Sequence, residues 1–280
     1  MRARFSRSWA LAKASWSVLM SDRSLLVYPI ISSIAVVILG ALILGPLFAF
    51  GVLDNLDTNA SGPAQIAGLF VLYLVCYTAI FFCNTALVSV VMQRLEGITT
   101  PVSGWSFARS RIGAILGYAA IAASVGVALR VLSDRSEIAG RIVAAIGGAV
   151  WAISTFLVVP VLVVEKTGPI DAIKRSAGLL KKTWGEQIIG NAGIGLATGL
   201  MMLGVGLVGG ALILLAVASG FLALIVIAIA ITLVALAIVM VVSSALDSIY
   251  RAALYRYATD HATNGFPAAE LLPEAFSPKK

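Results

Sequence analysis

Few residue types in this sequence could carry out acid–base or metal chemistry. His261 is the only histidine, so neither a histidine-based metal cluster nor a Ser-His-Asp triad can be assembled. The two thiols, Cys76 and Cys83, lie in one apolar segment, on one helix face and too far apart to form a disulfide within a regular helix. We interpret them as small buried apolar residues. We predict no catalytic residue, no cofactor and no metal.

The acidic residues avoid every long apolar run. Glu165 directly follows one run, and we expect it to pair locally with Lys166 or Arg175. Four other acids are interpreted as solvated loop charges: Asp54, Asp57, Asp134 and Glu137. Proton- and sodium-coupled transporters usually keep acids or broken helices at membrane depth. The distribution therefore argues against ion-coupled transport, and we predict a protein that is not an enzyme.

The composition indicates that lipid surrounds most of the chain. Apolar residues make up 60% of the 280 residues, charged residues make up 12%, and the mean hydropathy is +1.01. An ordinary soluble domain is about 45–50% apolar and about 25% charged. Runs long enough to cross a hydrocarbon core of about 30 Å predict six spans. They cover residues 25–50, 67–92, 112–132, 142–164, 188–217 and 221–246.

The last two spans come from a single uncharged run, residues 188–246, which is far too long for one crossing. We place the turn that divides it at residues 218–220. A turn at residues 209–210 is the alternative, and it would leave a very long last helix. Gly206 and Gly210 have the small-x-x-x-small spacing that lets helices approach closely, and we interpret this pair as packing within the helix bundle.

Basic residues are distributed unequally between the two sides of the six predicted spans. Seventeen of the 20 fall on the side that holds both termini, and three fall on the other side: Arg130, Arg135 and Arg141. The positive-inside rule assigns the richer side to the cytoplasm. We therefore predict an all-α integral membrane protein with both termini inside. Residues 1–258 form one six-helix membrane domain, and residues 259–280 form a polar, flexible cytoplasmic tail.

A short pattern recurs on the predicted cytoplasmic side. Arg7-Ser8 is followed by Leu11, Lys13, Ser15 and Trp16, and Arg175-Ser176 is followed at the same spacings by Leu179, Lys181, Thr183 and Trp184. Arg109-Ser110 begins a weaker copy before the third span. We predict three hairpins of spans, each introduced by a cytoplasmic amphipathic or juxtamembrane helix. Chance recurrence of these residue types in juxtamembrane helices is the alternative.

The copy before the fifth span has the clearest helix signals outside the spans. Pro169 suits a first helical turn after Gly168. One apolar side is expected from Ile170, Ile173, Ala177, Leu180 and Trp184. Such a helix lies in the headgroup plane with its lysines toward anionic lipid. Candidate contacts with lipid or a partner are Arg7, Lys13, Trp16, Lys174, Arg175, Lys181, Lys182 and Trp184. Topological anchoring alone is the plainer interpretation.

The segment from Val158 to Trp184, VVPVLVVEKTGPIDAIKRSAGLLKKTW, resembles a signature of bacterial inner-membrane proteins. A proline five residues before a glutamate, then Gly-Pro, Ala-Ile, Arg-Ser and a distal Trp carry the resemblance. The group includes uncharacterised six-helix families and the membrane domain fused to some glycerophosphodiester phosphodiesterases. The segment from Arg7 to Pro29 is similar to one such family of unknown function. The resemblance implies a multi-pass protein of the bacterial cytoplasmic (inner) membrane and no reaction, because the soluble phosphodiesterase domain has no counterpart here.

These observations predict a non-enzymatic scaffold, assembly factor or lipid-interacting accessory protein of the membrane. Its predicted partners are anionic lipid headgroups on the cytoplasmic side and a membrane protein. Nucleic acid is not a predicted partner, because the basic residues behind the net charge of +7 are spread over separate juxtamembrane segments. A transporter or flippase for a lipid or other amphiphile is the alternative. A membrane-embedded enzyme would need polar side chains to converge in a pocket that the linear sequence hides.

Overall fold

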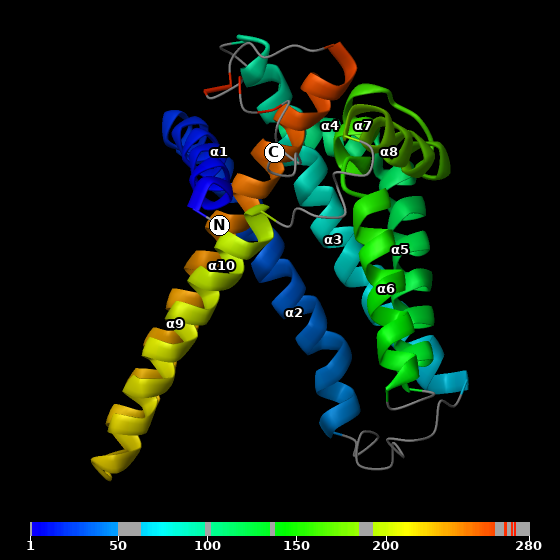
Figure 1. The fold of residues 1–280 in the computed structure, drawn as a ribbon. Helices are drawn as coiled ribbons and strands as arrows, with labels where there is room; N and C mark the ends of the chain where they lie inside the picture. Colours follow the sequence, from blue (N-terminus) through cyan, green and yellow to red (C-terminus); the bar gives the residue numbers. More distant parts are fainter. Residues whose placement is uncertain are drawn as a thin grey trace.

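The structure is a computed structural model that describes residues 2–49, 63–98, 102–134, 138–184 and 193–260, with short pieces at 266–267, 270 and 272. Every element in these residues is a helix (Figure 1). As predicted, six stretches are helical, long and apolar enough to cross a membrane. In chain order the elements are α1 Arg2–Ser21, η1 Arg23–Leu26, α2 Val27–Ala49, α3 Pro63–Leu95, α4 Gly104–Ser110, α5 Ile112–Asp134, α6 Ala139–Ser154, α7 Val158–Val164, α8 Pro169–Trp184, α9 Gly193–Ala218 and α10 Leu222–Asp260.

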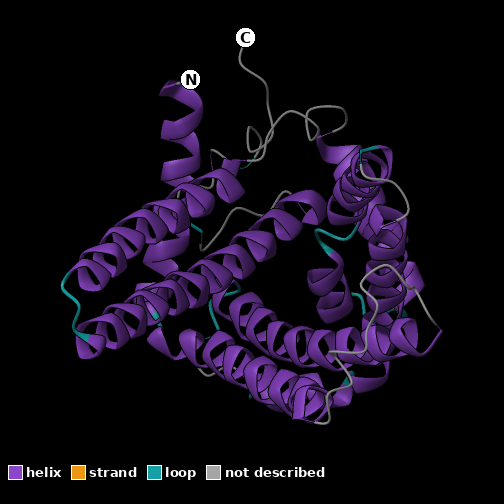
Figure 2. Ribbon diagram, turned by 90° about the horizontal axis from the view of Figure 1, so that it is seen from below, coloured by secondary structure: helices purple, strands orange, loops and turns teal. Residues whose placement is uncertain are grey.

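Helix α3 is the central span. It packs against α2, α5 and α10, while α6 packs on α5 and α9 packs on α10. In Figure 1, α3, α5 and α6 run side by side, whereas α9 and α10 lean away from them as a pair. Figure 2, seen from below, shows the turn between these two helices at the edge of the molecule. The α9–α10 hairpin is therefore joined to the remaining spans mainly at one end.

Two helices are much longer than a bilayer is thick. The 33 residues of α3 and the 39 residues of α10 span about 50 Å and about 58 Å at 1.5 Å per residue, against a hydrocarbon core of about 30 Å. The parts of α3 and α10 that extend beyond this thickness pack against shorter elements at one end of the molecule: α1, η1, α4, α7 and α8. We call this end of the molecule the cap. The cap therefore joins elements from both halves of the chain.

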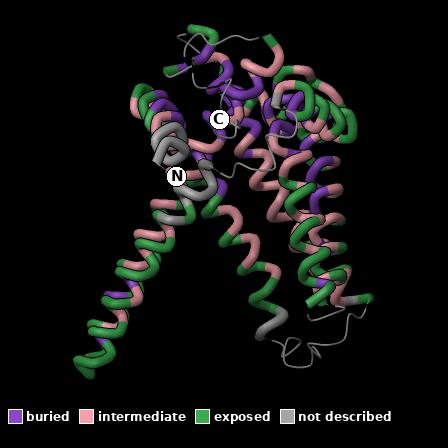
Figure 3. The backbone as a smooth tube through the Cα atoms, in the orientation of Figure 1, coloured by how far each residue is buried: buried purple, intermediate pink, exposed green. Residues whose placement is uncertain are grey.

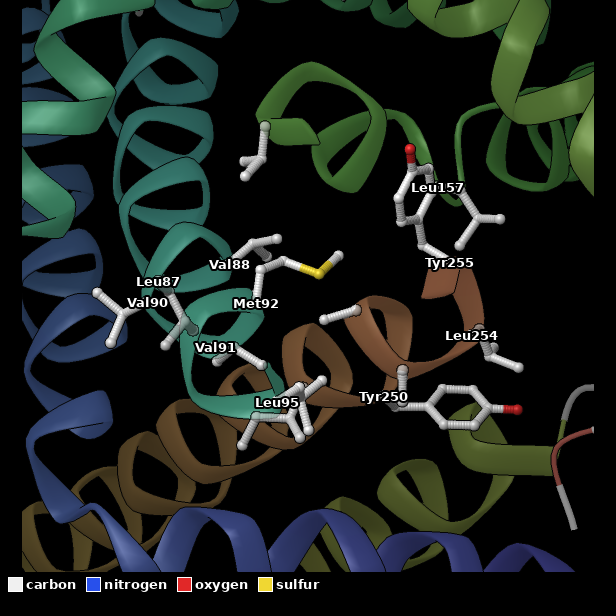
Figure 4. Close-up of a cluster of buried hydrophobic side chains, with 14 of the residues drawn as sticks. Leu87, Val88, Val90, Val91, Met92, Leu95, Leu157, Tyr250, Leu254 and Tyr255 are labelled. Carbon is white, nitrogen blue, oxygen red and sulfur yellow. The ribbon is translucent and has the colours of Figure 1, made fainter. Parts of the chain in front are cut away.

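The hydrophobic core lies in the cap. Buried residues gather at this end in Figure 3, and the spans below are mostly exposed or half-buried. Figure 4 shows side chains of α3, from Leu87 to Leu95, and Leu254 and Tyr255 of α10, which belong to the same buried cluster. On the spans, large apolar side chains such as Val37 and Leu214 are 70% and 72% exposed. Apolar surface of this extent is the surface that lipid covers.

The turn between the last two spans lies where the sequence predicts it. Helix α9 ends at Ala218 and α10 begins at Leu222. Gly220 has φ +73°, a left-handed conformation that glycine adopts without steric cost. The alternative turn position, Gly209, is inside α9. A Cβ there would lie 2.3 Å from Thr232 Cγ2 on α10, so Gly209 is a contact point between the two helices.

The expected packing of Gly206 and Gly210 is wrong for the described residues. A Cβ at either position would meet no atom within 4 Å. The glycine that α10 approaches is Gly209, because it lies on the side of α9 that faces α10. The glycine spacing identified one face of small residues on α9, but α9 contacts α10 through a neighbouring face.

The fourth predicted span, residues 142–164, is broken rather than continuous. Helix α6 ends at Ser154, a turn covers residues 155–157, and α7 begins at Val158. Pro160 explains the break, because proline has no N–H to give to the carbonyl four residues earlier, that of Phe156, and its ring collides with that carbonyl. After the break, Pro160 occupies the first turn of α7, where a missing N–H costs nothing.

Two other predicted boundaries differ in the structure. The last span, predicted to end at residue 246, continues without a break in α10 to Asp260. The weak middle copy of the repeat has only the seven-residue helix α4 before its span. Its Arg109-Ser110 pair ends α4, whereas Arg175-Ser176 lies in the middle of α8. The middle copy therefore does not supply a helix equivalent to α1 or α8.

Candidate functional site

Polar side chains from α8 and α10 hold the N-terminal end of α7. Leu157 N–H, at the break, donates to Ser176 Oγ of α8 at 3.0 Å. From the other side, Arg251 Nη1 of α10 donates to Phe156 O at 3.2 Å, the carbonyl to which Pro160 has no N–H to donate. The Arg251 guanidinium also lies 4.4 Å from the centre of the Phe156 ring, within cation–π range. The backbone groups freed by the break are thus satisfied by side chains.

The same two helices hold the C-terminal end of α7, through the carboxylate of Glu165. Arg175 Nε of α8 lies 2.8 Å from Glu165 Oε1, and Tyr255 Oη of α10 donates to the same oxygen at 3.1 Å. Of the two partners expected for Glu165, the structure selects Arg175. We call the four supporting residues, Arg175, Ser176, Arg251 and Tyr255, the α7 clamp.

Neighbouring contacts fix the elements of the clamp. Arg251 Nε lies 2.7 Å from Asp247 Oδ2, one helical turn earlier on α10. Arg111 Nη2, at the junction of α4 and α5, donates to Thr167 O in the link between α7 and α8 at 2.9 Å. The hydrogen bond to Glu165 raises the pKa of Arg175 above its usual value, so this guanidinium remains charged.

Helix α8 has three different sides, and the side buried against the protein differs from the predicted apolar side. Buried residues are Ala172, Ser176, Leu179 and Leu180, which pack toward α5, α6, α7 and α10. Of the predicted apolar side, Leu180 is buried, Ile173 and Ala177 are half-buried, and Ile170 is 58% exposed. At 3.6 residues per turn the two sides differ by about a quarter of a turn. An apolar flank therefore remains beside the protein contact.

Two of the four basic residues of α8 border this apolar flank. Lys174, Lys181, Lys182 and Arg175 are all exposed, and Lys174 and Lys181 follow directly beside Ile170 around the helix. The N-terminus of α8 is fixed to a span, since a Cβ at Gly117 of α5 would lie 2.9 Å from Pro169 Cγ. The side chain of Trp184 lies outside the described residues.

Some residues of the first repeat copy, in helix α1, can be compared with their counterparts in α8. Leu11 and its counterpart Leu179 are each 3% exposed, and Lys13 and its counterpart Lys181 are both exposed. Trp16 is 44% exposed, whereas the side chain of Arg7 lies outside the described residues. Helix α1 packs on α9 and α10. In both copies, therefore, the leucine contacts the protein and the lysine faces outward.

Comparison with known proteins places the chain in a family. The sequence pattern of a family of unknown function, DUF6159, matches residues 63–266. The chain belongs to DUF6159. The matched range contains α7, α8 and the whole α7 clamp, whereas the Arg7-to-Pro29 segment lies outside it. The chain matches no curated protein and no solved structure.

In this DUF6159 protein the predicted contact residues form two separate groups. Helices α1 and α8 lie on opposite sides of the cap (Figure 1), so their basic residues do not converge on one pocket. Both groups nevertheless lie at the same end of the molecule as Asp247 to Asp260 of α10. In the described residues, α8 thus provides a basic surface on one side of the core, and α1 provides the exposed Lys13 on the other.

The α7 clamp of the DUF6159 chain was only partly visible in its sequence. The sequence predicts that Glu165 pairs with Lys166 or Arg175, but no prediction from it includes Arg251 or Tyr255. Their spacing of four residues, which puts both on one side of α10, is the signal that could have found them. Within the described residues, no three His, Cys, Asp or Glu side chains lie together in a way that could hold a metal ion.

Proposed function

We propose that this DUF6159 protein is a non-enzymatic scaffold, assembly factor or lipid-interacting accessory protein that binds anionic headgroups through α8. The observation that carries the proposal is the three-sided character of α8. One side packs on the protein, the flank with Ile170 suits lipid, and the lysines beside it suit headgroups. Each basic residue near an anionic surface contributes about 1 kcal/mol.

The proposed topology places the cap in the cytoplasm, with three hairpins of spans below it and both termini inside. It is supported by the division of the 20 basic residues into 17 and three. In cells, single cysteines at Asp57, Arg135, Lys174 and Lys279 test it after Cys76 and Cys83 have been replaced. An impermeant thiol reagent added from outside is expected to label only the first two. Labelling at position 174 in intact cells would contradict the orientation. We also propose that the membrane is the bacterial inner membrane.

Lipid binding is tested with the purified full chain in detergent by native mass spectrometry. The triple variant Lys174→Gln, Lys181→Gln, Lys182→Gln is expected to lose up to about 150-fold in affinity for phosphatidylglycerol, since three charges together contribute up to about 3 kcal/mol. Its affinity for phosphatidylcholine is expected to stay unchanged. Arg141→Gln, which removes an exposed charge from the opposite end, is the control. Equal losses in both variants, or no preference for anionic lipid in the parent, would contradict the proposal.

A transporter or flippase for a lipid or other amphiphile is the second candidate. The α9–α10 hairpin favours it, because the hairpin leans away from the other spans (Figure 1) and exposes apolar side chains over most of its length. An amphiphile could pass beside such a hairpin. Reconstituted vesicles that move a fluorescent phospholipid only when the protein is present would support this candidate, and movement equal to that in empty vesicles would eliminate it.

A further inference from the structure

Arg175 differs from the three lysines of α8 because it is bound to an acid. Its Nε lies 2.8 Å from Glu165 Oε1, yet half of its side chain, 50%, is exposed. An exposed ion pair of this kind contributes only about 0.2–1 kcal/mol. Phosphate oxygens accept two parallel hydrogen bonds from a guanidinium, so a phosphate at the surface of α8 is a strong competitor for Arg175.

Glu165 does not depend on Arg175 alone. Tyr255 Oη donates to the same carboxylate oxygen at 3.1 Å, and 24% of the Glu165 side chain is exposed. If Arg175 turned away, the carboxylate would keep the tyrosine donor and gain water. Breaking an ion pair is costly when it leaves a buried charge unpaired. Here no buried charge would be left unpaired. The release of Arg175 is therefore cheap.

We propose that Arg175 is the specific phospholipid ligand of α8, and that Glu165 is an internal competitor that holds this arginine until an anionic headgroup displaces it. The proposal rests on the proposed function, in which α8 lies at the membrane surface. The ligand is a phospholipid rather than a soluble phosphate, because Lys174, the residue before Arg175, adjoins the apolar flank with Ile170. The contact between α7 and α8 thus limits headgroup binding.

Two variants of the full chain are expected to change phosphatidylglycerol affinity in opposite directions. Glu165→Gln frees Arg175 and is expected to raise the affinity about two- to fivefold, the factor that an exposed ion pair corresponds to. Tyr255→Phe removes the second donor, so Glu165 binds Arg175 more firmly, and the affinity is expected to fall by a similar factor. Damage to the fold would lower the affinity in both variants.

The control for charge is Asp171→Asn. Asp171 is an exposed acid in the first turn of the same helix, so this variant removes one negative charge from α8 without releasing an arginine. Its gain is expected to be smaller than that of Glu165→Gln. Native mass spectrometry of the detergent-purified proteins with phosphatidylglycerol measures all three variants. Inorganic phosphate at matched anion concentration is expected not to displace the bound lipid.

The outcomes separate this inference from the proposed function. The role of Glu165 would be overturned if Glu165→Gln bound the lipid no more tightly than Asp171→Asn. It would also be overturned if both Glu165→Gln and Tyr255→Phe lost affinity. In either case a loss of binding in the triple lysine variant would still support the proposed function. Displacement of the lipid by inorganic phosphate would overturn the assignment of a phospholipid. If the triple lysine variant bound phosphatidylglycerol like the parent, the proposed function itself would fail.

Discussion

Substitution of two adjacent glycines in α9 is expected to have opposite effects on stability. A Cβ at Gly209 would lie 2.3 Å from Thr232 Cγ2 and 2.7 Å from Thr232 Oγ1, distances at which something must shift. A Cβ at Gly210 would meet no atom within 4 Å. Thr232 cannot rotate freely to make room, because its hydroxyl donates to Ala228 O at 2.7 Å. Gly209→Ala must therefore push α9 and α10 apart.

The size of the effect follows from two opposing terms. Alanine in place of glycine inside a helix gains about 1 kcal/mol of unfolding free energy, and this gain applies to both variants. Overpacking costs about 1–3 kcal/mol and applies only to Gly209→Ala. Gly210→Ala is thus expected to be up to about 1 kcal/mol more stable than the parent. The difference between the two variants, about 1–3 kcal/mol, isolates the contact with Thr232.

The assay is unfolding of the detergent-purified chain by increasing sodium dodecyl sulfate, followed by far-ultraviolet circular dichroism. The double variant Gly209→Ala, Thr232→Ala removes the two nearest atoms of the clash and is expected to recover most of the lost stability. Equal stability of Gly209→Ala and Gly210→Ala would refute the close approach of α9 and α10. A double variant no more stable than Gly209→Ala would show that the loss has another cause.

Further predictions concern the α7 clamp and the start of the first span. Ser176→Ala leaves the buried Leu157 N–H without its acceptor and is expected to cost about 1–3 kcal/mol of unfolding free energy. The control is Ser110→Ala, at an exposed residue, which is expected to change the unfolding free energy by no more than about 0.5 kcal/mol. Equal losses for the two variants in the same titration would contradict this role of Ser176. Burial alone would raise the pKa of Asp22, but hydrogen bonds from Ser24 and the ion pair with Arg94 lower it below its ordinary value. The stabilisation by Asp22 is therefore complete above pH about 3.9 and is lost as the pH falls toward the lower folded-state pKa. Asp22→Asn is expected to flatten the stability curve in that range, and parallel curves for variant and parent would refute the assignment.

The positions of the spans could be predicted because hydrophobic length alone limits them. The run of residues 188–246 can be divided into two spanning helices at only a few positions, and residues 218–220 offer the glycine that the turn needs. Gly220 indeed has a positive φ. Helix lengths beyond the bilayer were harder to predict, because the last turns of α3 and α10 are stabilised by the cap and not by lipid.

The orientation of α8 around its own axis could not be predicted from its pattern. A helical-wheel argument assigns one apolar side, whereas a helix at the boundary between protein and lipid has two apolar neighbours. The small residues Ala172 and Ser176 face the protein because the neighbouring helices approach there. The larger Ile170 is left on the flank. Apolar periodicity therefore identified the helix and its apolar side, whereas the side that contacts the protein is set by the neighbouring helices.

The break before α7 shows why the recurring segment of residues 158–184 has its particular residues. Pro160 has no N–H to donate to Phe156 O, and Arg251, 95 residues later in the chain, donates to that carbonyl. No local pattern could reveal a partner at that distance. Glu165 and the Arg175-Ser176 pair then support the two ends of the short helix that the proline creates. These positions all lie in residues 63–266, which match DUF6159, and because Arg175 supports α7 through Glu165, a lipid that binds Arg175 must compete with that support.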